Sequence, residues 1–328
     1  MTNVALVLLD DAGAGDAGVL GHPILRTPHI DAFARSGVRF SAAYAGAPNC
    51  SPSRAALLTG RAPFRTGVYD FLSKRSGSMH LAAGETTIAA LLRASGYQTL
   101  HLGKWHLSRR GAGHGFAPPH FGFDHSNESY APASQLVAAF GGWLRGGRRR
   151  GAPFFAYLAL WEPHEPAANI RQAVADACGG RHSWGSSGGL RGAKGYVYEG
   201  GIRVPLFLQW PAFTRGQSAT VQTPVHLWDL LPTLVEAAGV PLDADTRGEL
   251  DGATSAARGR LADAGHYGGQ CTGGAVVCSE WKLLAGYGDT PSRSHGPAPG
   301  GEVTEWLRAC ELGRAELYRV SHDPTEAR

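Results

Sequence analysis

A cysteine at the start of a predicted helix is the first group in this sequence that could do chemistry. Cys50 opens the stretch CSPSRAALLTGR. Its Ser-Pro-Ser triplet is a helix-start signal, and the alanines and leucines that follow favour a helix. Free backbone N–H groups at a helix N-terminus, with the Arg54 cation one turn inside, would stabilise an anion. The residues thus predict either a reactive thiol that meets an anion or a buried structural cysteine beside an ordinary helix.

Two adjacent carboxylates follow the first apolar run of the chain. Residues 4–9 (VALVLL) predict a central strand of a parallel sheet, buried on both faces, and Asp10 and Asp11 come directly after it. Neighbouring carboxylates repel each other unless a proton or a cation joins them. Oxygen ligands suit Ca²⁺ or Mg²⁺, so the pair predicts a metal site. Two solvated turn aspartates are the alternative.

Two further predicted strands also end in groups that could bind or protonate a substrate. Residues 97–102 lead into GKWHL, where Lys104 and His106 alternate and would point to one face. Residues 153–160 lead into WEPHEP, which places His164 at another strand end. Open α/β sheets bind their ligands at the carboxyl ends of the strands. A cation and an imidazole there suit an anionic substrate, and a surface lysine beside a packed histidine is the alternative.

Periodicity and capping signals predict the elements that would position these groups. Helices are expected over residues 27–37, over 88–95 with Thr86 as N-cap, over 135–145, over 170–177 and over 226–238. Further strands are expected over 38–44 and 202–210, a loop over 108–133, and a small terminal sheet over 273–284 and 315–320. The alternation of strands and helices predicts an α/β fold.

Composition excludes several classes of protein. The chain has 328 residues, a net charge of +4 and 43% hydrophobic residues, which is typical of a globular protein and too weakly basic for nucleic-acid binding. The RGGRRR run at 145–150 is interpreted as a solvated loop. No stretch approaches the ~20 apolar residues of a membrane span. Met1 is followed at once by the first strand, without a signal peptide, so the compartment stays undetermined.

Three ordered motifs together resemble the sulfatase family, nearest its arylsulfatase A and N-acetylgalactosamine-6-sulfatase group. CSPSRAALLTGR matches the signature C-x-P-S-R-x-x-L-L-T-G-R at every fixed position, GKWHL matches a second signature, and RGAKGYVYEGGIRVP matches a third nearly throughout. The resemblance implies an alkaline-phosphatase-like α/β sandwich with a mostly parallel central sheet, helices on both faces and a small C-terminal antiparallel sheet. It also implies a catalytic domain over 1–241, shortened near 165–185, and a C-terminal subdomain over 242–328.

Hydrolysis of sulfate monoesters, on a sulfated small molecule or sugar, is the activity that this resemblance implies. In the family the cysteine equivalent to Cys50 is oxidised to formylglycine by a partner, the formylglycine-generating enzyme, and the hydrated aldehyde supplies the nucleophile. The implied catalytic residues are Cys50, Arg54, Lys104, His106, His164 and Lys194. Arg54 would stabilise the alkoxide, and the two lysines would bind sulfate oxygens. His106 would assist elimination at the diol, and His164 would protonate the leaving oxygen.

The metal ligands are where this sequence departs from the family. Asp10, Asp11 and the modified Cys50 would bind Ca²⁺, with Mg²⁺ as the alternative ion. The family completes this shell with a strand that ends in Asp-Asn-Gly, but here those two ligand positions fall on Ala177 and Cys178. A mis-joined gene model and a real internal deletion are the two explanations.

Three functions follow from these observations. The first is a formylglycine-dependent sulfatase. The second is a catalytically impaired sulfatase-like protein that binds anionic or sulfated ligands, because the Asp-Asn pair is missing. The third is a phosphomonoesterase or phosphonate hydrolase, which the motif around Cys50 does not exclude.

Overall fold

The protein is described by a computed structural model that covers residues 2–73, 79–108, 116–164, 185–211 and 218–254, four later strands, Asp323 and Thr325. The predicted helix over 170–177 and the expected metal-ligand segment with Ala177 and Cys178 lie outside the described residues. Contacts divide the chain into two units. The first comprises residues 1–10, 50–165 and 228–254, and the second comprises residues 11–49, 166–227 and 255–328. The predicted domain boundary at 241/242 stays a prediction.

A parallel sheet forms the centre of the first unit. Its strands are β1 (Val4–Asp10), β5 (Phe154–Pro163), β3 (Gln98–Gly103) and β4 (His125–Glu128), hydrogen-bonded in that order and all parallel. Strand β4 lies in a segment predicted as loop. Its sequence HSNE is polar and exposed, which is typical of a short edge strand. Without an apolar pattern, this strand could not be predicted from the sequence.

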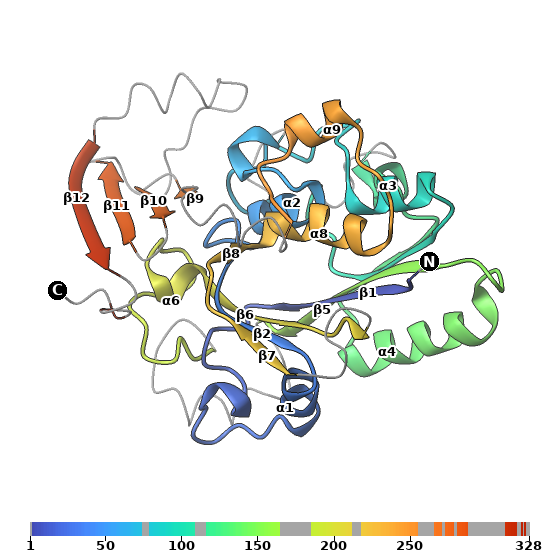
Figure 1. Ribbon diagram of the computed structural model, residues 1–328, viewed down its shortest axis with the longest axis horizontal. Coiled ribbons are helices and arrows are strands. Elements are labelled where there is room, and N and C mark those ends of the chain that lie inside the picture. Colours follow the sequence, from blue (N-terminus) through green and yellow to red (C-terminus); the bar gives the residue numbers. More distant parts are fainter. Residues whose placement is uncertain are drawn as a thin grey trace. The chain divides into compact units, whose positions relative to one another are not determined.

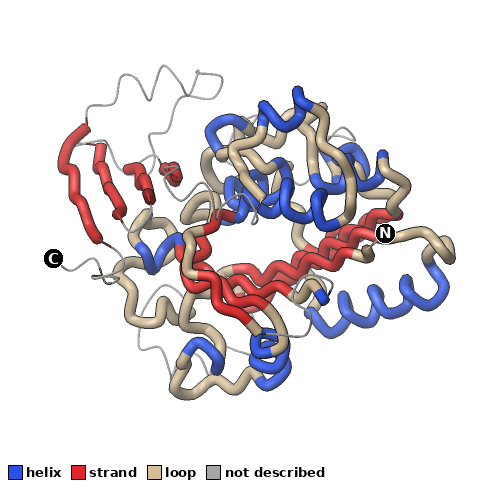
Figure 2. The backbone as a smooth tube through the Cα atoms, in the orientation of Figure 1, coloured by secondary structure: helices blue, strands red, loops and turns tan. Residues whose placement is uncertain are grey.

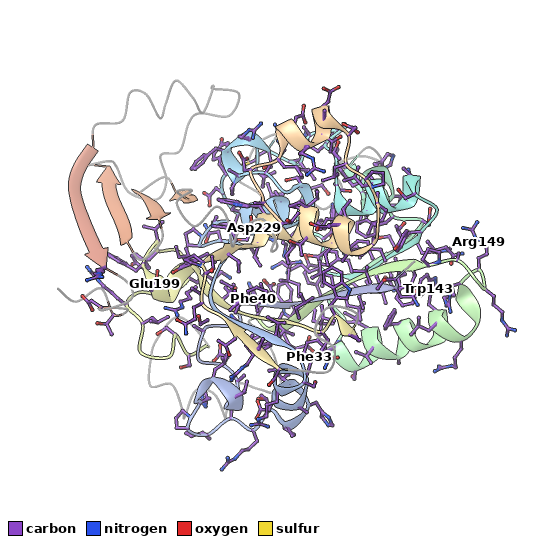
Figure 3. The ribbon with its side chains drawn as sticks, viewed as in Figure 1. Phe33, Phe40, Trp143, Arg149, Glu199 and Asp229 are labelled. Atoms are coloured by element: carbon purple, nitrogen blue, oxygen red, sulfur yellow. The ribbon has the colours of Figure 1, made fainter. Side chains whose placement is uncertain are left out.

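Helices cover both faces of this sheet, as Figure 1 shows for α4 on one side and α2, α3 and α8 on the other. On one face, Leu136 of α4 (Ala133–Gly142) packs against Leu100, Leu102 and Leu158. Trp143, labelled in Figure 3, follows α4 and packs edge-on against a ring of β5. Helices α2 (Cys50–Thr59), α3 (Ile88–Ala94) and α8 (Leu230–Ala237) cover the opposite face. Two-residue alternation along the strands divides their side chains between these layers.

Two details of the first unit correct the sequence-based expectations. Residues 4–9 do form a strand, but burial alternates along β1, and Val7 and Leu9 are 55% and 38% exposed. The strand is therefore not buried on both faces, because β1 is the end strand among the described residues. The N-cap of α3 is Thr87 rather than Thr86: Thr87 directly precedes the first helical residue, and its hydroxyl accepts the N–H of Ala90.

A second sheet, made of β2, β6, β7 and β8, belongs to the second unit. Strand β2 (Val38–Tyr44) follows α1 (Pro28–Arg35) and pairs antiparallel with β6 (Arg203–Leu208). It pairs in parallel with β7 (Ala219–Val221) and β8 (Val225–His226). Helix α6 (Glu199–Ile202) leads into β6. The strands expected over 38–44 and 202–210 are thus present, but in a sheet of their own, because an apolar run does not specify its pairing partner.

The C-terminal strands form a third sheet, which is wholly antiparallel. Its order is β12-β11-β10-β9, as Figure 2 shows, with β9 (His266–Gln270), β10 (Gly273–Cys278), β11 (Trp281–Tyr287) and β12 (Leu312–Arg319). The predicted terminal sheet is confirmed, but residues 273–284, expected as one strand, contain β10 and the start of β11, and β9 was not foreseen.

Shorter elements complete the described chain. They are α9 (Ala244–Glu249), 3-10 turns at Gly18–Leu20, Pro63–Arg65, Pro118–Phe121 and Leu227–Asp229, and a π-turn at Trp143–Gly147. Among the described helices, none has the length and apolar content needed to cross a membrane.

Candidate active site

Helix α2 begins at Cys50 itself, so the thiol lies at the N-terminus of a ten-residue helix. Cys50 is partly exposed and carries a free thiol, whereas nearly all of the helix behind it is buried. The hydroxyl of Ser51, fully buried, accepts the backbone N–H of Leu72 and fixes the first turn. Backbone N–H groups at this end of the helix favour negative charge beside residue 50.

His106 lies against this thiol, with Nδ1 3.3 Å from Cys50 Sγ. On the other side of the ring, Nε2 lies 2.8 Å from the carbonyl oxygen of Leu72. A carbonyl oxygen can only accept a hydrogen bond, so Nε2 carries the proton and Nδ1 presents a lone pair to residue 50. Burial, together with the nearby charges of Lys104 and Arg54, lowers the pKa of His106 to about 4. The imidazole is therefore neutral near pH 7 and oriented as a base.

The turn after β3 orients Lys104 and His106, and this turn requires a glycine at position 103. Gly103 has φ +101°, and a Cβ there would overlap the carbonyl oxygen of Ala159. That carbonyl accepts the N–H of Lys104 at 2.8 Å, which anchors the turn to β5. Trp105 is buried between the two functional residues, and its indole N–H donates to the Phe116 carbonyl. The GKWH motif thus points a lysine and a histidine into the site around a packed tryptophan.

Three buried charges meet where β1 and β3 end. Asp10, Arg54 and Lys104 are 4%, 2% and 2% exposed. Lys104 Nζ donates to Asp10 Oδ2 at 2.5 Å, and Arg54 Nη2 lies 3.4 Å from Asp10 Oδ1. Burial raises the pKa of Asp10, but Arg54 and Lys104 outweigh it, so the pKa lies below its ordinary value. With Asp10 ionised, one negative and two positive charges leave an excess of positive charge that suits an anion.

Two aromatic residues in this cluster were missed from the sequence. Tyr157 of β5 is fully buried, its hydroxyl lies 3.3 Å from Arg54 Nη1, and burial raises its pKa. Trp161 stacks beneath Lys104, with Nζ 4.5 Å from the ring centroid. The His164 ring packs at a tilt against the same tryptophan, with its ring centroid 4.3 Å from that of Trp161. The strand-end position of WEPH was the available signal for Trp161, whereas a tyrosine inside an apolar strand gave none.

The first unit therefore brings together five of the six predicted catalytic residues: Cys50, Arg54, Lys104, His106 and His164. Arg54 is held by the carbonyl of Lys104 at 2.8 Å as well as by Tyr157 and Asp10. Its part in stabilising an alkoxide stays a prediction.

The sixth residue, Lys194, belongs to the second unit together with Asp11. Lys194 Nζ lies 2.7 Å from Asp11 Oδ2, and both side chains are partly exposed. Asp11 has φ +68°, so the backbone turns sharply directly after Asp10.

A glutamate in the third motif, YEGGIR, also escaped the sequence reasoning. Glu199, labelled in Figure 3, is fully buried on α6. Its Oε2 accepts hydrogen bonds from the Tyr44 hydroxyl and from Arg203 Nη1, both at 3.2 Å. These contacts join α6 to β2 and explain the glutamate as a structural anchor of the motif.

The described residues do not fit a divalent metal as they stand. Among them, no group of three or more histidine, cysteine, aspartate or glutamate side chains could hold an ion. Both oxygens of Asp10 face buried cations, and Asp11 is paired with Lys194. Ca²⁺ requires six to eight oxygen ligands. Asp10, Asp11 and Cys50 stay predicted ligands, and binding would require both lysines to release their carboxylates.

Comparison with known proteins identifies the class. A sequence model described as Sulfatase matches residues 2–183, more than half of the chain. The chain is 32% identical to arylsulfatase A of Homo sapiens over 76% of this chain and 66% of the relative. It is 27% identical to N-acetylgalactosamine-6-sulfatase of Mus musculus over 74% of this chain and 64% of the relative. The chain belongs to the sulfatase family.

Structural comparison gives the same fold. The structure of Ps i-CgsB in complex with k-i-k-neocarrahexaose superposes with a TM-score of 0.76, at 22% identity, over 100% of this chain and 88% of that one. The predicted alkaline-phosphatase-like α/β fold is confirmed.

The chain is shorter than its relatives, and it spans somewhat less than two thirds of their length. The alignment with human arylsulfatase A has 340 positions, but it includes only 76% of the 328 residues of this chain. The alignment must therefore contain gaps in this chain, and the internal shortening near residues 165–185 stays a prediction.

Proposed function

We propose that this protein hydrolyses sulfate monoesters, with the side chain of residue 50 as nucleophile after conversion of Cys50 to formylglycine. The contact between Cys50 and His106 carries the proposal. A neutral imidazole whose lone pair faces residue 50 is the group that proton removal from that side chain requires. Membership of the sulfatase family supports the same activity.

One hydroxyl of the formylglycine hydrate would lose its proton to water and attack sulfur, which breaks the bond between sulfur and the alcohol oxygen. Deprotonation of the second hydroxyl would then release sulfate and regenerate the aldehyde, which water hydrates again. His106 accepts the proton of the second hydroxyl at Nδ1, because Nε2 is held by the Leu72 carbonyl. Lys104 and Lys194 bind the oxygens of the substrate's sulfate group. His164 protonates the leaving alcohol oxygen.

Arg54 and Asp10 give this site its charge. Arg54 is held in place by Tyr157 and by the Lys104 carbonyl, so its positive charge is fixed near the N-terminus of α2. Asp10 offsets only one of the two buried cations. The remaining positive charge favours a sulfate dianion or an alkoxide over a neutral group. Because the described residues do not fit a divalent ion, no step here passes through one.

A second candidate is an anion-binding protein without turnover. The pairing of Asp10 and Asp11 with lysines, rather than with further candidate ligands among the described residues, favours it. Both candidates predict that sulfate or a sulfated sugar binds, and only the first predicts that the ester is cleaved.

Co-expression with the formylglycine-generating enzyme separates the two candidates. The mass of the peptide with residue 50 reports its conversion, and 4-nitrophenyl sulfate reports turnover. We expect conversion and turnover, both abolished in Cys50→Ala. His106→Gln should reduce kcat by about 10²–10⁴-fold, the range for loss of a general base. The exposed histidine of β4 provides the control His125→Gln, which should retain activity.

Full conversion of Cys50 without turnover above the Cys50→Ala background would reject hydrolysis and leave the anion-binding candidate. Equal losses in His106→Gln and His125→Gln would reject the assigned role of His106.

A further inference from the structure

Asp16 ties together two segments of the second unit that lie 170 residues apart in the sequence. Its Oδ2 accepts the N–H of Gly13 at 2.7 Å, and its Oδ1 accepts the N–H of Ser186 at 2.6 Å. Beside it, the N–H of Gly15 donates to the Ser186 carbonyl at 2.7 Å. One carboxylate thus folds the glycine-rich turn that follows Asp11 and fastens the later segment to it.

The two segments meet backbone to backbone. A Cβ on Gly15 would lie 2.6 Å from the backbone nitrogen of Gly188, and one on Gly185 would lie 2.6 Å from Asp16 Oδ2. Any side chain at these glycines would force the segments apart. Burial raises the pKa of Asp16, and its two backbone hydrogen bonds only partly oppose this. The carboxylate therefore occupies a closely built site whose donors are backbone N–H groups.

The segment fastened by Asp16 leads directly to Lys194. Beyond that lysine, the N–H of Gly195 donates to the Pro48 carbonyl at 3.0 Å. Lys194 thus lies between two anchor points, the first at Ser186 and the second at Gly195. Its ammonium pairs with Asp11, at the start of the turn that Asp16 folds.

We infer that Asp16 is a positioning residue that determines where the Lys194 ammonium lies, and thereby how firmly the protein holds the sulfate group of its substrate. The inference rests on the proposed function, in which Lys194 binds sulfate oxygens. Both oxygens of Asp16 are taken up by backbone donors, so Asp16 acts through Lys194 rather than on the substrate.

Asp16→Asn tests this, because an amide retains one acceptor oxygen and puts an NH₂ group against a backbone donor. We expect KM for 4-nitrophenyl sulfate, and Ki for inorganic sulfate, to rise about tenfold, the scale of one lost charge-assisted hydrogen bond. The value of kcat should change by no more than about threefold, since ground-state anion binding is what is lost. Gly15→Ala, which separates the same segments with Asp16 intact, should reproduce the effect.

Asp31→Asn is the matched control in the same unit. Its carboxylate also joins two turns, by accepting the Val19 N–H at 2.9 Å and the Thr27 hydroxyl at 2.7 Å. Among the described residues, its hydrogen bonds do not reach the segment that carries Lys194. Its KM should stay within about twofold of wild type. In Asp16→Asn/Lys194→Met, the rise in KM should not exceed that of Lys194→Met alone, because residues that act as a unit are non-additive. The inference is overturned if the two substitutions raise KM multiplicatively in the double variant, or if Asp31→Asn raises KM as much as Asp16→Asn does.

If the wild-type protein, with Cys50 converted, does not hydrolyse 4-nitrophenyl sulfate, the proposed function is rejected but this inference is not. In that case, hydrogen exchange over residues 185–195 and the Kd for inorganic sulfate decide it. Faster exchange and weaker sulfate binding in Asp16→Asn, but not in Asp31→Asn, would support positioning by Asp16. Unchanged exchange and unchanged sulfate binding would overturn it.

Discussion

Replacement of Asp10 by asparagine should destabilise the first unit strongly. Lys104 and Arg54 are both buried beside this carboxylate, so Asp10→Asn leaves two buried cations without their counter-charge. Removing one partner from a buried ion pair costs about 3–5 kcal/mol. For a unit of this size, a loss of that order lowers the unfolding midpoint by about 10 °C.

Thermal and urea unfolding, followed by circular dichroism, measure this loss. Asp243→Asn is the control, because Asp243 is an exposed N-cap that accepts the Thr246 N–H at 2.7 Å. Asparagine caps helices about as well as aspartate, so this variant should unfold close to wild type.

A second substitution tests the physical cause. Lys104→Met removes one uncompensated cation, so it should cost less in the Asp10→Asn background than in wild type, with a coupling energy of about 1–3 kcal/mol. If Asp10→Asn is no worse than Asp243→Asn, or if the two losses simply add, the charge cluster does not stabilise the unit as argued.

Three further outcomes follow from the structure. Burial lowers the pKa of His101 to about 3, so the folded protein holds it neutral while the unfolded chain binds a proton below its ordinary value of 6.5. Stability should then fall as the pH drops from 6.5 towards 3, by up to about 1.4 kcal/mol per pH unit, and His101→Phe should flatten that slope in urea titrations. Gly103→Ala puts a Cβ against the Ala159 carbonyl at positive φ, and it should lower the unfolding free energy by about 1–3 kcal/mol. Excess Ca²⁺ or EDTA should barely move the thermal midpoint, since Asp10 is paired internally; a Ca²⁺-dependent rise that Asp10→Asn abolishes would show that Lys104 releases the carboxylate to an ion.

Most of the elements could be predicted from local pattern. The helix that starts at Cys50 and the strands before Asp10 and Lys104 are present near their predicted bounds, and the terminal sheet is present with different strand bounds. Apolar periodicity and capping residues are local signals, and these elements follow them. Strand β4 was missed because a polar edge strand has no apolar period.

Pairing between strands was beyond the sequence. Nothing in the apolar run of β2 indicates that its partner is β6, or that they run antiparallel. Likewise, a run of six apolar residues predicted full burial for β1, whereas its place at the end of the described sheet exposes Val7. Partners far apart in the chain decide both features.

For the site, residue types nominated Cys50 from its place at a predicted helix start, and Lys104 and His106 from their place at a strand end. The tertiary structure decided how these groups are oriented and which charges surround them. It turns the lone pair of His106 towards residue 50 through a carbonyl 34 residues away. It places Asp10 between two buried cations, and it joins Asp16 by a hydrogen bond to the segment that leads to Lys194. Hydrogen-bond direction and the balance of buried charge depend on which side chains meet in space, and no local pattern carries that information.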